Sequence, residues 1–445
     1  MGTTCSFVRH GAIALVSSFA VISSASAGPL ESAIASELAR ELENSAQTYQ
    51  HQAMEARVKA ARADLFPAVK LKGIEARRHE SVRAVESSLI RDGENTFDNS
   101  RFTASISQPI FDKEIYGQIA EAKAYTKFSQ DALALEKSEI AETFLTAYLA
   151  IAKGKELRES YGRSVSLLAQ EKQRATKKLE ANLITVRELN SINAMLLNTQ
   201  KNREFYNSTT ARSRSYLDSR LVGGAEAVPV IDSRSNFAGL AAPSEPVTGG
   251  AMMDADVISL RTDIELLNAR ESTERAKRLP KVSLVAQYEY DDAAETVFGG
   301  PNQIEDYEVG IQLEWKLFRG GQSRHKISEI NALRNAKQAR LNKMLATAEG
   351  GLELQVSAFE QAKRRLELEQ EVMRYREELN SASDSAYQAG KEGLMDYIGA
   401  QLQLEDSRRA VISAKYDLLD QYVRMHSLAA TLLDQAVPEI DGYFN

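Results

Sequence analysis

Residues 282–290 read VSLVAQYEY and residues 307–316 read YEVGIQLEWK, and these two stretches decide the fold. In each, apolar side chains alternate with mainly polar ones, which predicts a β-strand with one apolar face. The residues between them are polar and include Gly299-Gly300-Pro301, as expected of an exposed turn. We therefore predict a β-hairpin over residues 281–318.

An upstream stretch shows the same alternation more faintly. Phe102, Ala104 and Ile106 are separated by hydroxyl-bearing residues. Paired with the run at 69–77, this stretch predicts a second hairpin over residues 68–110.

The length and the ends of these strands favour a membrane over a soluble core. A tilted strand needs about 9–11 residues to cross a bilayer. Aromatic side chains lie near the strand ends, as in the two girdles of membrane barrels. The predicted girdle residues are Tyr288, Tyr290 and Tyr307 toward the turn, with Trp315 and Phe318 at the opposite end.

Four strands per chain are too few to close a barrel. An open sheet edge in lipid would leave backbone groups without hydrogen bonds. Three chains would supply about twelve strands, an even number typical of membrane barrels. The strand pattern therefore predicts an oligomer.

The chain contains one layout twice. Phe66-Pro67 corresponds to Leu279-Pro280, and Phe111 corresponds to Phe318. Matches in the same order at nearly constant spacing indicate an internal duplication. The predicted parts are a first repeat at 28–222, a Gly- and Pro-rich connector at 223–255, a second repeat at 256–437 and a C-terminal tail at 438–445.

Each repeat is predicted to be mainly helical outside its hairpin. The segments 112–180 and 321–389 contain no Pro, and as helices each would extend roughly 100 Å. Asn182 and Gly390 follow them and tolerate the left-handed conformation that ends a helix. The other helices are predicted at 31–64, 186–221, 256–278 and 394–433.

Apolar residues recur at every seventh position from Tyr397 to Leu432 in the last of these helices. Such a period predicts coiled-coil packing against a neighbouring helix. A soluble coiled-coil hairpin would show the same stripe, so the stripe indicates architecture and not function.

The composition excludes several functional classes. The 445 residues carry a net charge of −7 and one Cys, which excludes a disulfide scaffold and a Cys-rich metal site. An acidic chain argues against nucleic-acid binding. The five His are scattered, and the chain contains no phosphate-loop or nucleophile motif. We therefore expect neither an enzyme nor a cofactor.

Residues 1–27 resemble a signal peptide. An apolar run at 12–22 precedes Ala25-Ser26-Ala27, a small-residue cleavage site, and cleavage there would remove Cys5. No later run approaches 18 consecutive apolar residues, so we expect an exported protein without a membrane-spanning helix.

Together these features resemble the TolC family of outer-membrane efflux and secretion channels. The resemblance covers about residues 31–435 and rests on the export signal, the duplicated layout and a Pro after each first helix. It also rests on a turn motif made by Tyr387 and Gly390, followed by Asp396, Ala400 and Leu402.

The resemblance implies a mainly α-helical protomer with a small β part, within a homotrimer. The trimer would form an α-helical barrel continued by a transmembrane β-barrel of about twelve strands. It would lie in the cell outer membrane, in contact with its lipid, and extend far into the periplasm. It would act as a passive conduit with a periplasmic adaptor protein and an inner-membrane transporter, either ABC-type or proton-driven. Type I protein secretion and multidrug efflux share this architecture, so the cargo stays open.

The resemblance also implies residues at the periplasmic entrance. Asp396 matches an acid that lines the constricted opening, whereas Gly399 replaces a second acid. Glu188 and Tyr387 match residues that latch the closed tip, and Glu392 stands where the family has the basic partner. Lys391 or Arg187 could substitute for that partner. An acid near a helix N-terminus is also favourable, so Asp396 could cap its helix, line the pore or do both.

Two other functions fit parts of the pattern. A soluble periplasmic adaptor would contain a coiled-coil hairpin, although an adaptor has one hairpin and this chain has two. An exported enzyme or binding protein with helical repeats is the other alternative.

Overall fold

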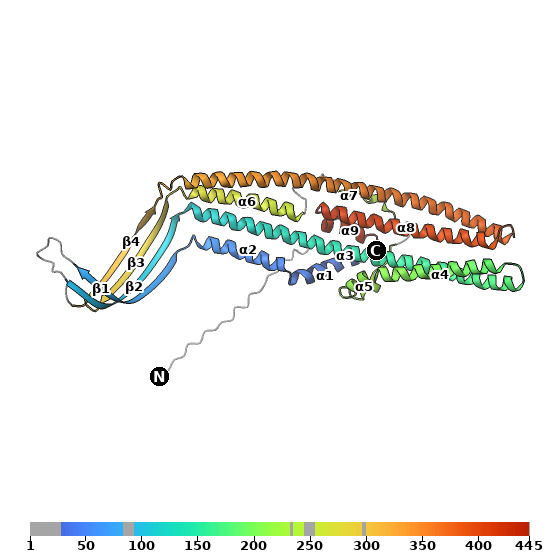
Figure 1. The fold of residues 1–445 in the computed structure, drawn as a ribbon, viewed down its shortest axis with the longest axis horizontal. Helices are drawn as coiled ribbons and strands as arrows, with labels where there is room; N and C mark the ends of the chain where they lie inside the picture. Colours follow the sequence, from blue (N-terminus) through green and yellow to red (C-terminus); the bar gives the residue numbers. More distant parts are fainter. Residues whose placement is uncertain (1–27, 83–92, 232–234, 244–253, 296–299, 445) are drawn as a thin grey trace, which may run out of the picture.

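A computed structural model of the chain describes residues 28–82, 93–231, 235–243, 254–295 and 300–444. The predicted signal peptide at 1–27, with Cys5, lies outside these residues, as does Gly299 of the predicted turn. The molecule is elongated, with a small sheet at one end and long helices running away from it (Figure 1).

The sheet is antiparallel, with the strand order β1-β2-β3-β4. β2 pairs with β3, so the hairpins of the two repeats form one continuous sheet. The register pairs Ala104 with Leu71 and Tyr288 with Tyr307. The strands are β1 (Ala68–Val82), β2 (Gly93–Phe111), β3 (Lys281–Ala293) and β4 (Asn302–Glu314).

The second hairpin differs from its prediction at both ends. The predicted turn began at Asp291, but β3 continues to Ala293 because the Asp291 carboxylate accepts hydrogen bonds from Arg101 and Asn99 of β2. At the other end, β4 stops at Glu314, one residue before Trp315. The Trp315 indole N–H donates to the Arg278 carbonyl at 3.0 Å, which turns this residue toward the helix junction.

The first helix of each repeat ends before its Pro, but the first repeat departs from the predicted single helices. The segment predicted at 31–64 is two helices, α1 (Pro29–Glu43) and α2 (Ala46–Ala63). Ser45 separates the two helices. Its hydroxyl accepts a hydrogen bond from the Thr48 N–H of α2 and donates one to Glu136, which is distant in sequence. The corresponding helix of the second repeat is α6 (Ala255–Ala276).

The returning helix of the first repeat is also divided, into α4 (Val186–Thr209) and α5 (Ala211–Asp218). Thr210 lies at the break, where its hydroxyl donates to the Tyr206 carbonyl at 3.0 Å. The Thr210 side chain also packs closely against Gly154 of the neighbouring long helix. A Cβ atom at position 154 would lie 2.5 Å from Thr210 Cγ2, which is too close for any larger residue.

The two long helices are continuous. They are α3 (Lys113–Glu180) and α7 (Gln322–Gln388), and α7 passes through Gly350-Gly351 without a break. The returning helix of the second repeat, α8 (Leu394–Leu428), ends before the predicted residue 433, and Ala430 just beyond it has a φ of 60°. The chain then continues as a short π-helix, η3 (Leu432–Ala436), and as α9 (Val437–Asp441), so the predicted tail at 438–445 is helical as far as Asp441.

A hydrophobic cluster fills the middle of the helical region, and we call it the belt core. Phe144 of α3, Phe359 of α7 and Tyr422 of α8 are almost fully buried in it. The described part of the connector joins this cluster through the short helices η1 (Gly224–Ala227) and η2 (Phe237–Gly239) and through buried Val228, Ile231 and Leu240.

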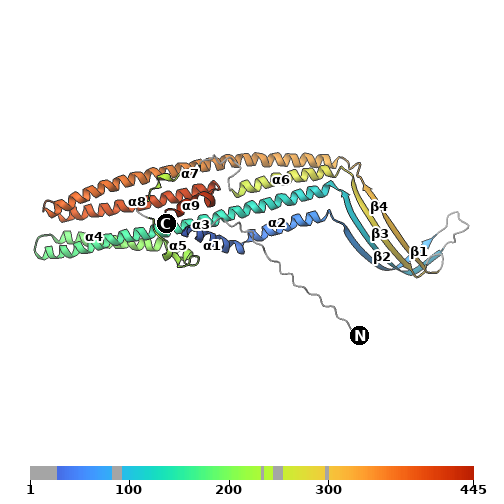
Figure 2. The ribbon, with the colours of Figure 1, turned by 180° about the vertical axis from the view of Figure 1, so that it is seen from behind.

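The ends of the described chain also meet at the belt core. Asp441 of α9 accepts a hydrogen bond from the Leu30 N–H at 2.8 Å, and Tyr443 stacks on Phe237 with ring centroids 4.6 Å apart. Figure 2 shows the C-terminus beside α8 and α3 from behind.

Among the described residues, we find no helix with the length and apolar character of a membrane span.

Candidate functional site

The helical end farthest from the sheet consists of two hairpins side by side, α3–α4 and α7–α8, and we call this end the tip (Figure 1). Asn182 and Gly390 lie in its two turns with φ values of 56° and 69°. The Leu183 N–H bonds to the Lys178 carbonyl at 2.8 Å, and the Lys391 N–H bonds to the Ala386 carbonyl at 2.9 Å. Both turns therefore satisfy the last helical carbonyls in the same way.

Lys178 and Tyr387 join the two hairpins at the tip. The Lys178 ammonium donates to the Tyr387 hydroxyl at 2.7 Å and lies 5.0 Å from the centre of its ring. The Tyr387 ring stacks on Tyr397 with centroids 4.5 Å apart. Within the chain, Lys178 on the last turn of α3 is therefore a cationic neighbour of Tyr387. Sequence reasoning missed Lys178 because it belongs to the other repeat.

A small hydrophobic cluster supports this contact, and we call it the tip cluster. Ile398 is fully buried in it, and Tyr397 is 9% exposed. Burial raises the pKa of Tyr397, and the nearby Glu171 carboxylate raises it further. The hydroxyl therefore stays protonated at neutral pH. The members of the tip cluster are Leu168, Ala175, Ile192, Leu394, Tyr397 and Ile398.

Two of the acids proposed for the tip are engaged in local turns. Glu188 and Thr185 form a reciprocal capping box, in which Glu188 accepts from the Thr185 N–H at 2.7 Å. This backbone hydrogen bond, together with one from the Thr185 hydroxyl, lowers the pKa of Glu188. Glu392 accepts from the Ser383 hydroxyl at 2.7 Å, which ties the second turn to α7.

Asp396 differs from these two acids. It is exposed in the first turn of α8, and the N-cap of that helix is Gly393, with no side-chain cap hydrogen bond. Asp396 is therefore not the N-cap residue itself, but its charge lies in the first turn, where it favours the helix as the capping alternative expects.

Between the tip cluster and the belt core, α3 and α8 meet through buried polar side chains. The Ser160 hydroxyl donates to Glu405 at 2.9 Å, and the Arg409 guanidinium donates to Ser164 at 3.0 Å. Nearer the belt, Lys415 pairs with Glu156 at 2.7 Å. The sequence offered one signal for this seam, namely polar residues between the apolar positions of the heptad stripe.

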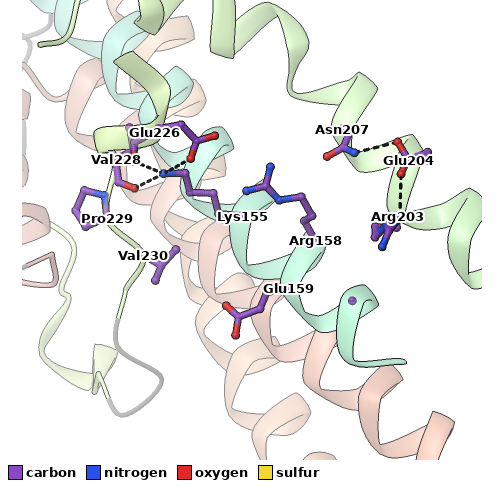
Figure 3. A pocket seen from close by; sticks show the side chains of 11 residues that line it. Lys155, Arg158, Glu159, Arg203, Glu204, Asn207, Glu226, Val228, Pro229 and Val230 are labelled. Carbon is purple, nitrogen blue, oxygen red and sulfur yellow. Dashed lines mark hydrogen bonds and ion pairs between the residues drawn. The ribbon is translucent and has the colours of Figure 1, made fainter. Parts of the chain in front are cut away.

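One cavity lies beside the connector and is lined by charged side chains of both signs. Figure 3 shows this cavity of about 690 Å³, in which Lys155 points toward the connector. Its ammonium donates to the carbonyls of Glu226 and Val228 at 2.7 and 2.8 Å. Lys155 thus anchors the connector to α3. Across the described residues, no group of three or more His, Cys, Asp or Glu could hold a metal ion.

The sheet has two unlike faces. Directly opposed residues share a face, so the pairs Phe102–Tyr290 and Tyr288–Tyr307 place aromatic rings on the apolar face. Val309 is 77% exposed on this face. The opposite face is mainly polar, with Arg101, Asp306 and Glu308 among its residues. An exposed apolar surface of this kind marks an interaction with lipid or with another protein.

The comparisons agree with this architecture. Residues 254–431 match the model of the outer membrane efflux protein family. A comparison with curated proteins found no matching sequence.

Several solved structures share the fold at low sequence identity. A membrane protein from Pseudomonas aeruginosa has 15% identity and a TM-score of 0.71, with 90% of each chain covered. The outer membrane protein VceC from Vibrio cholerae has 15% identity and a TM-score of 0.67, with 90% of this chain and 96% of VceC covered. The outer membrane channel MtrE of Neisseria gonorrhoeae has 13% identity and a TM-score of 0.68, with 91% of this chain and 89% of MtrE covered.

The chain therefore has the fold of these outer-membrane proteins over about nine-tenths of its length, and its residues 254–431 match the outer membrane efflux protein family.

Proposed function

We propose that this protein is the outer-membrane channel of a tripartite export system and that it works as a homotrimer. The observation that carries the proposal is the sheet, which combines one exposed apolar face with two unpaired edges. Four strands with open edges are not viable in lipid, but a ring of about twelve strands is. The domain match and the shared fold support the same conclusion.

The apolar face has the dimensions of a membrane band. On β3 it runs from Val282 to Tyr290, which corresponds to roughly 30 Å along a strand. Tyr288, Tyr290 and Tyr307 lie at its end nearer the turn, whereas Trp315 and Phe318 follow β4 at the helical end. We propose that these two aromatic groups are the girdles at the two surfaces of the outer membrane.

The helices would then form a conduit through the periplasm. A channel without a catalytic centre depends on partners for energy, so we propose a periplasmic adaptor and an inner-membrane transporter of the ABC or proton-driven type. The cargo is either protein, as in type I secretion, or small molecules, as in multidrug efflux. We also propose that the protein is exported by a signal peptide at residues 1–27, which is then cleaved.

The tip would be the periplasmic entrance. We propose that Asp396, in three copies, lines the opening with negative charge, a common source of cation preference. Tyr387 with Lys178 would hold the two hairpins of each protomer together, while Glu188 and Glu392 shape the turns that carry them.

Membrane fractionation followed by size analysis tests this proposal. We expect the native protein in the outer-membrane fraction as trimers that form pores in a planar bilayer. Recovery as a monomer in the periplasmic soluble fraction would instead support the soluble adaptor and overturn the channel.

A further inference from the structure

The two open edges of the sheet carry opposite charges on the polar face. On β1, the exposed edge residues of this face include Lys70, Lys72 and Arg78. On β4, they include Asp306, Glu308 and Glu314. The edges flank the sheet on opposite sides, so these two sets are separated by β2 and β3 within one chain (Figure 1).

The same face already contains an ion pair of this kind between neighbouring strands. Arg101 of β2 lies directly opposite Asp291 of β3, and their charged groups are 2.6 Å apart. A basic residue facing an acidic one across two strands is therefore a contact that this sheet accommodates.

The register of a closed ring follows from the helix boundaries. Ala68, Ser107, Val285 and Gly310 lie in one hydrogen-bonded row. From this row to the nearest helix, the chain runs five residues on β1 (to α2), six on β2 (to α3), nine on β3 (to α6) and twelve on β4 (to α7). The strands are thus tilted relative to the helices, as barrel strands are.

If the stagger continues into the next copy, the row meets the β1 strand of that copy about eight residues beyond Ala68. The shift must be an even number of residues, because an odd shift would turn the polar side chains to the other face. Gly310 of β4 would then face Ala76 of the next β1. In that register Glu314 faces Lys72, and Glu308 faces Arg78. In the same register Asp306 faces Glu80 with Arg78 on its diagonal, and Lys70 faces Lys316 with Glu314 on its diagonal, so Lys72–Glu314 and Arg78–Glu308 are the opposite-charge pairs that face each other directly.

We propose that two ion pairs between copies, Lys72 with Glu314 and Arg78 with Glu308, direct the head-to-tail joining of β1 to β4 and fix its register. The occupant of each edge is a second copy of this chain. Within one chain, the charged groups of Arg78 and Glu80 are 3.9 Å apart, and those of Glu314 and Lys316 are 3.0 Å apart. Arg78 and Glu314 nevertheless stay exposed. The inference rests on the proposed trimeric channel and adds the residues that select its partner edge.

Charge exchange tests the ion pairs in the full-length protein. We expect Lys72→Glu with Arg78→Glu, or Glu308→Lys with Glu314→Lys, to lower the fraction of detergent-resistant trimer by about tenfold, because like charges directly opposite destabilise a strand pair at three junctions. The four changes together should restore the trimer, and Lys72→Arg with Arg78→Lys should leave it intact. Full trimer in both double variants, or no recovery in the fourfold variant, would overturn the proposal.

Disulfide trapping tests the register without reversing any charge. With Cys5→Ser as background, Lys72→Cys combined with Glu314→Cys should yield covalent trimers on oxidation, because such pairs meet the distance limit of a disulfide. Lys72→Cys with Glu308→Cys is the matched control, displaced by roughly 20 Å along the strand. Cross-linking in the control pair alone would overturn the register, whereas native protein that is monomeric outside the membrane would overturn the channel itself.

Discussion

The belt core and the tip cluster are both hydrophobic clusters on the same helices, but they are built differently. The belt core draws on α1, α3, α7, α8, the connector and the C-terminal segment, including the stacked pair Phe237–Tyr443. The tip cluster uses a few residues of α3, α4 and α8. Segments with few buried apolar contacts open locally, whereas those tied into the main core open only with it. We infer that the belt holds the folded chain together while the tip is free to rearrange.

The largest effect is expected from emptying the belt core. Phe359 is fully buried and packs against Tyr422, with ring centroids 5.7 Å apart. Phe359→Ala should lower the free energy of unfolding by about 3–5 kcal/mol through lost burial and a cavity. Urea denaturation followed by circular dichroism measures this change. Arg364→Ala, at an exposed position of the same helix, is the control, and equal stability of the two variants would contradict a belt that holds the fold.

An equivalent cavity at the tip should act locally. Ile398 is fully buried, and Ile398→Ala should lower the free energy of local opening by about 2–4 kcal/mol. Hydrogen exchange should accelerate in peptides around residues 168–198 and 385–400, with little change around 410–425. Acceleration spread evenly over both regions would show that tip and belt unfold together.

The contact between the hairpins is expected to contribute less. Lys178→Met removes one hydrogen bond and one cation–π contact to Tyr387, together worth about 1–2 kcal/mol. Because this contact joins α3 to α7, its loss should raise the mean conductance of the proposed channel when it is reconstituted in a planar bilayer. Lys177→Met, at the exposed neighbouring position, should leave conductance unchanged, and the same conductance in both variants would argue against a latch.

Asp396 should affect selectivity and not stability, since its side chain is exposed. Asp396→Asn removes three charges from the proposed entrance and should reduce both cation preference and blockage by multivalent cations. Reversal potentials in a salt gradient measure the first effect, and current inhibition measures the second. Unchanged values would remove Asp396 from the pore lining.

The smallest effect concerns pH at the first turn. The pKa of Glu188 is lowered by its capping hydrogen bonds, so the cap stabilises the folded turn at neutral pH. That contribution is fully present above the ordinary pKa of a glutamate and fades as the pH falls through the lowered value. Hydrogen exchange at the start of α4 should therefore rise in acid, and Glu188→Gln should abolish this pH dependence. A persistent dependence in the variant would assign it to another group.

The sequence predicted the long helices well because their signal is local. α3 and α7 contain no Pro, and Asn182 and Gly390 are suited to the left-handed turns that follow. The division between α1 and α2 was missed, since Ser45 bonds to Glu136, far away in sequence. The extension of β3 was missed for the same reason. Asp291 is a residue type typical of turns, and its strand position depends on Arg101 of β2, which donates a hydrogen bond to it.

By itself, the sequence determined the duplicated layout, the periodicity of the strands and the positions of both tip turns, because each depends on residues a few positions apart. Only the tertiary structure decided which side chains meet across the repeats. Lys178 reaches Tyr387, Arg101 faces Asp291, and the connector enters the belt because α3 lies beside α8 and β2 beside β3. Those neighbours follow from burying both repeats in one core, a condition that no local pattern encodes.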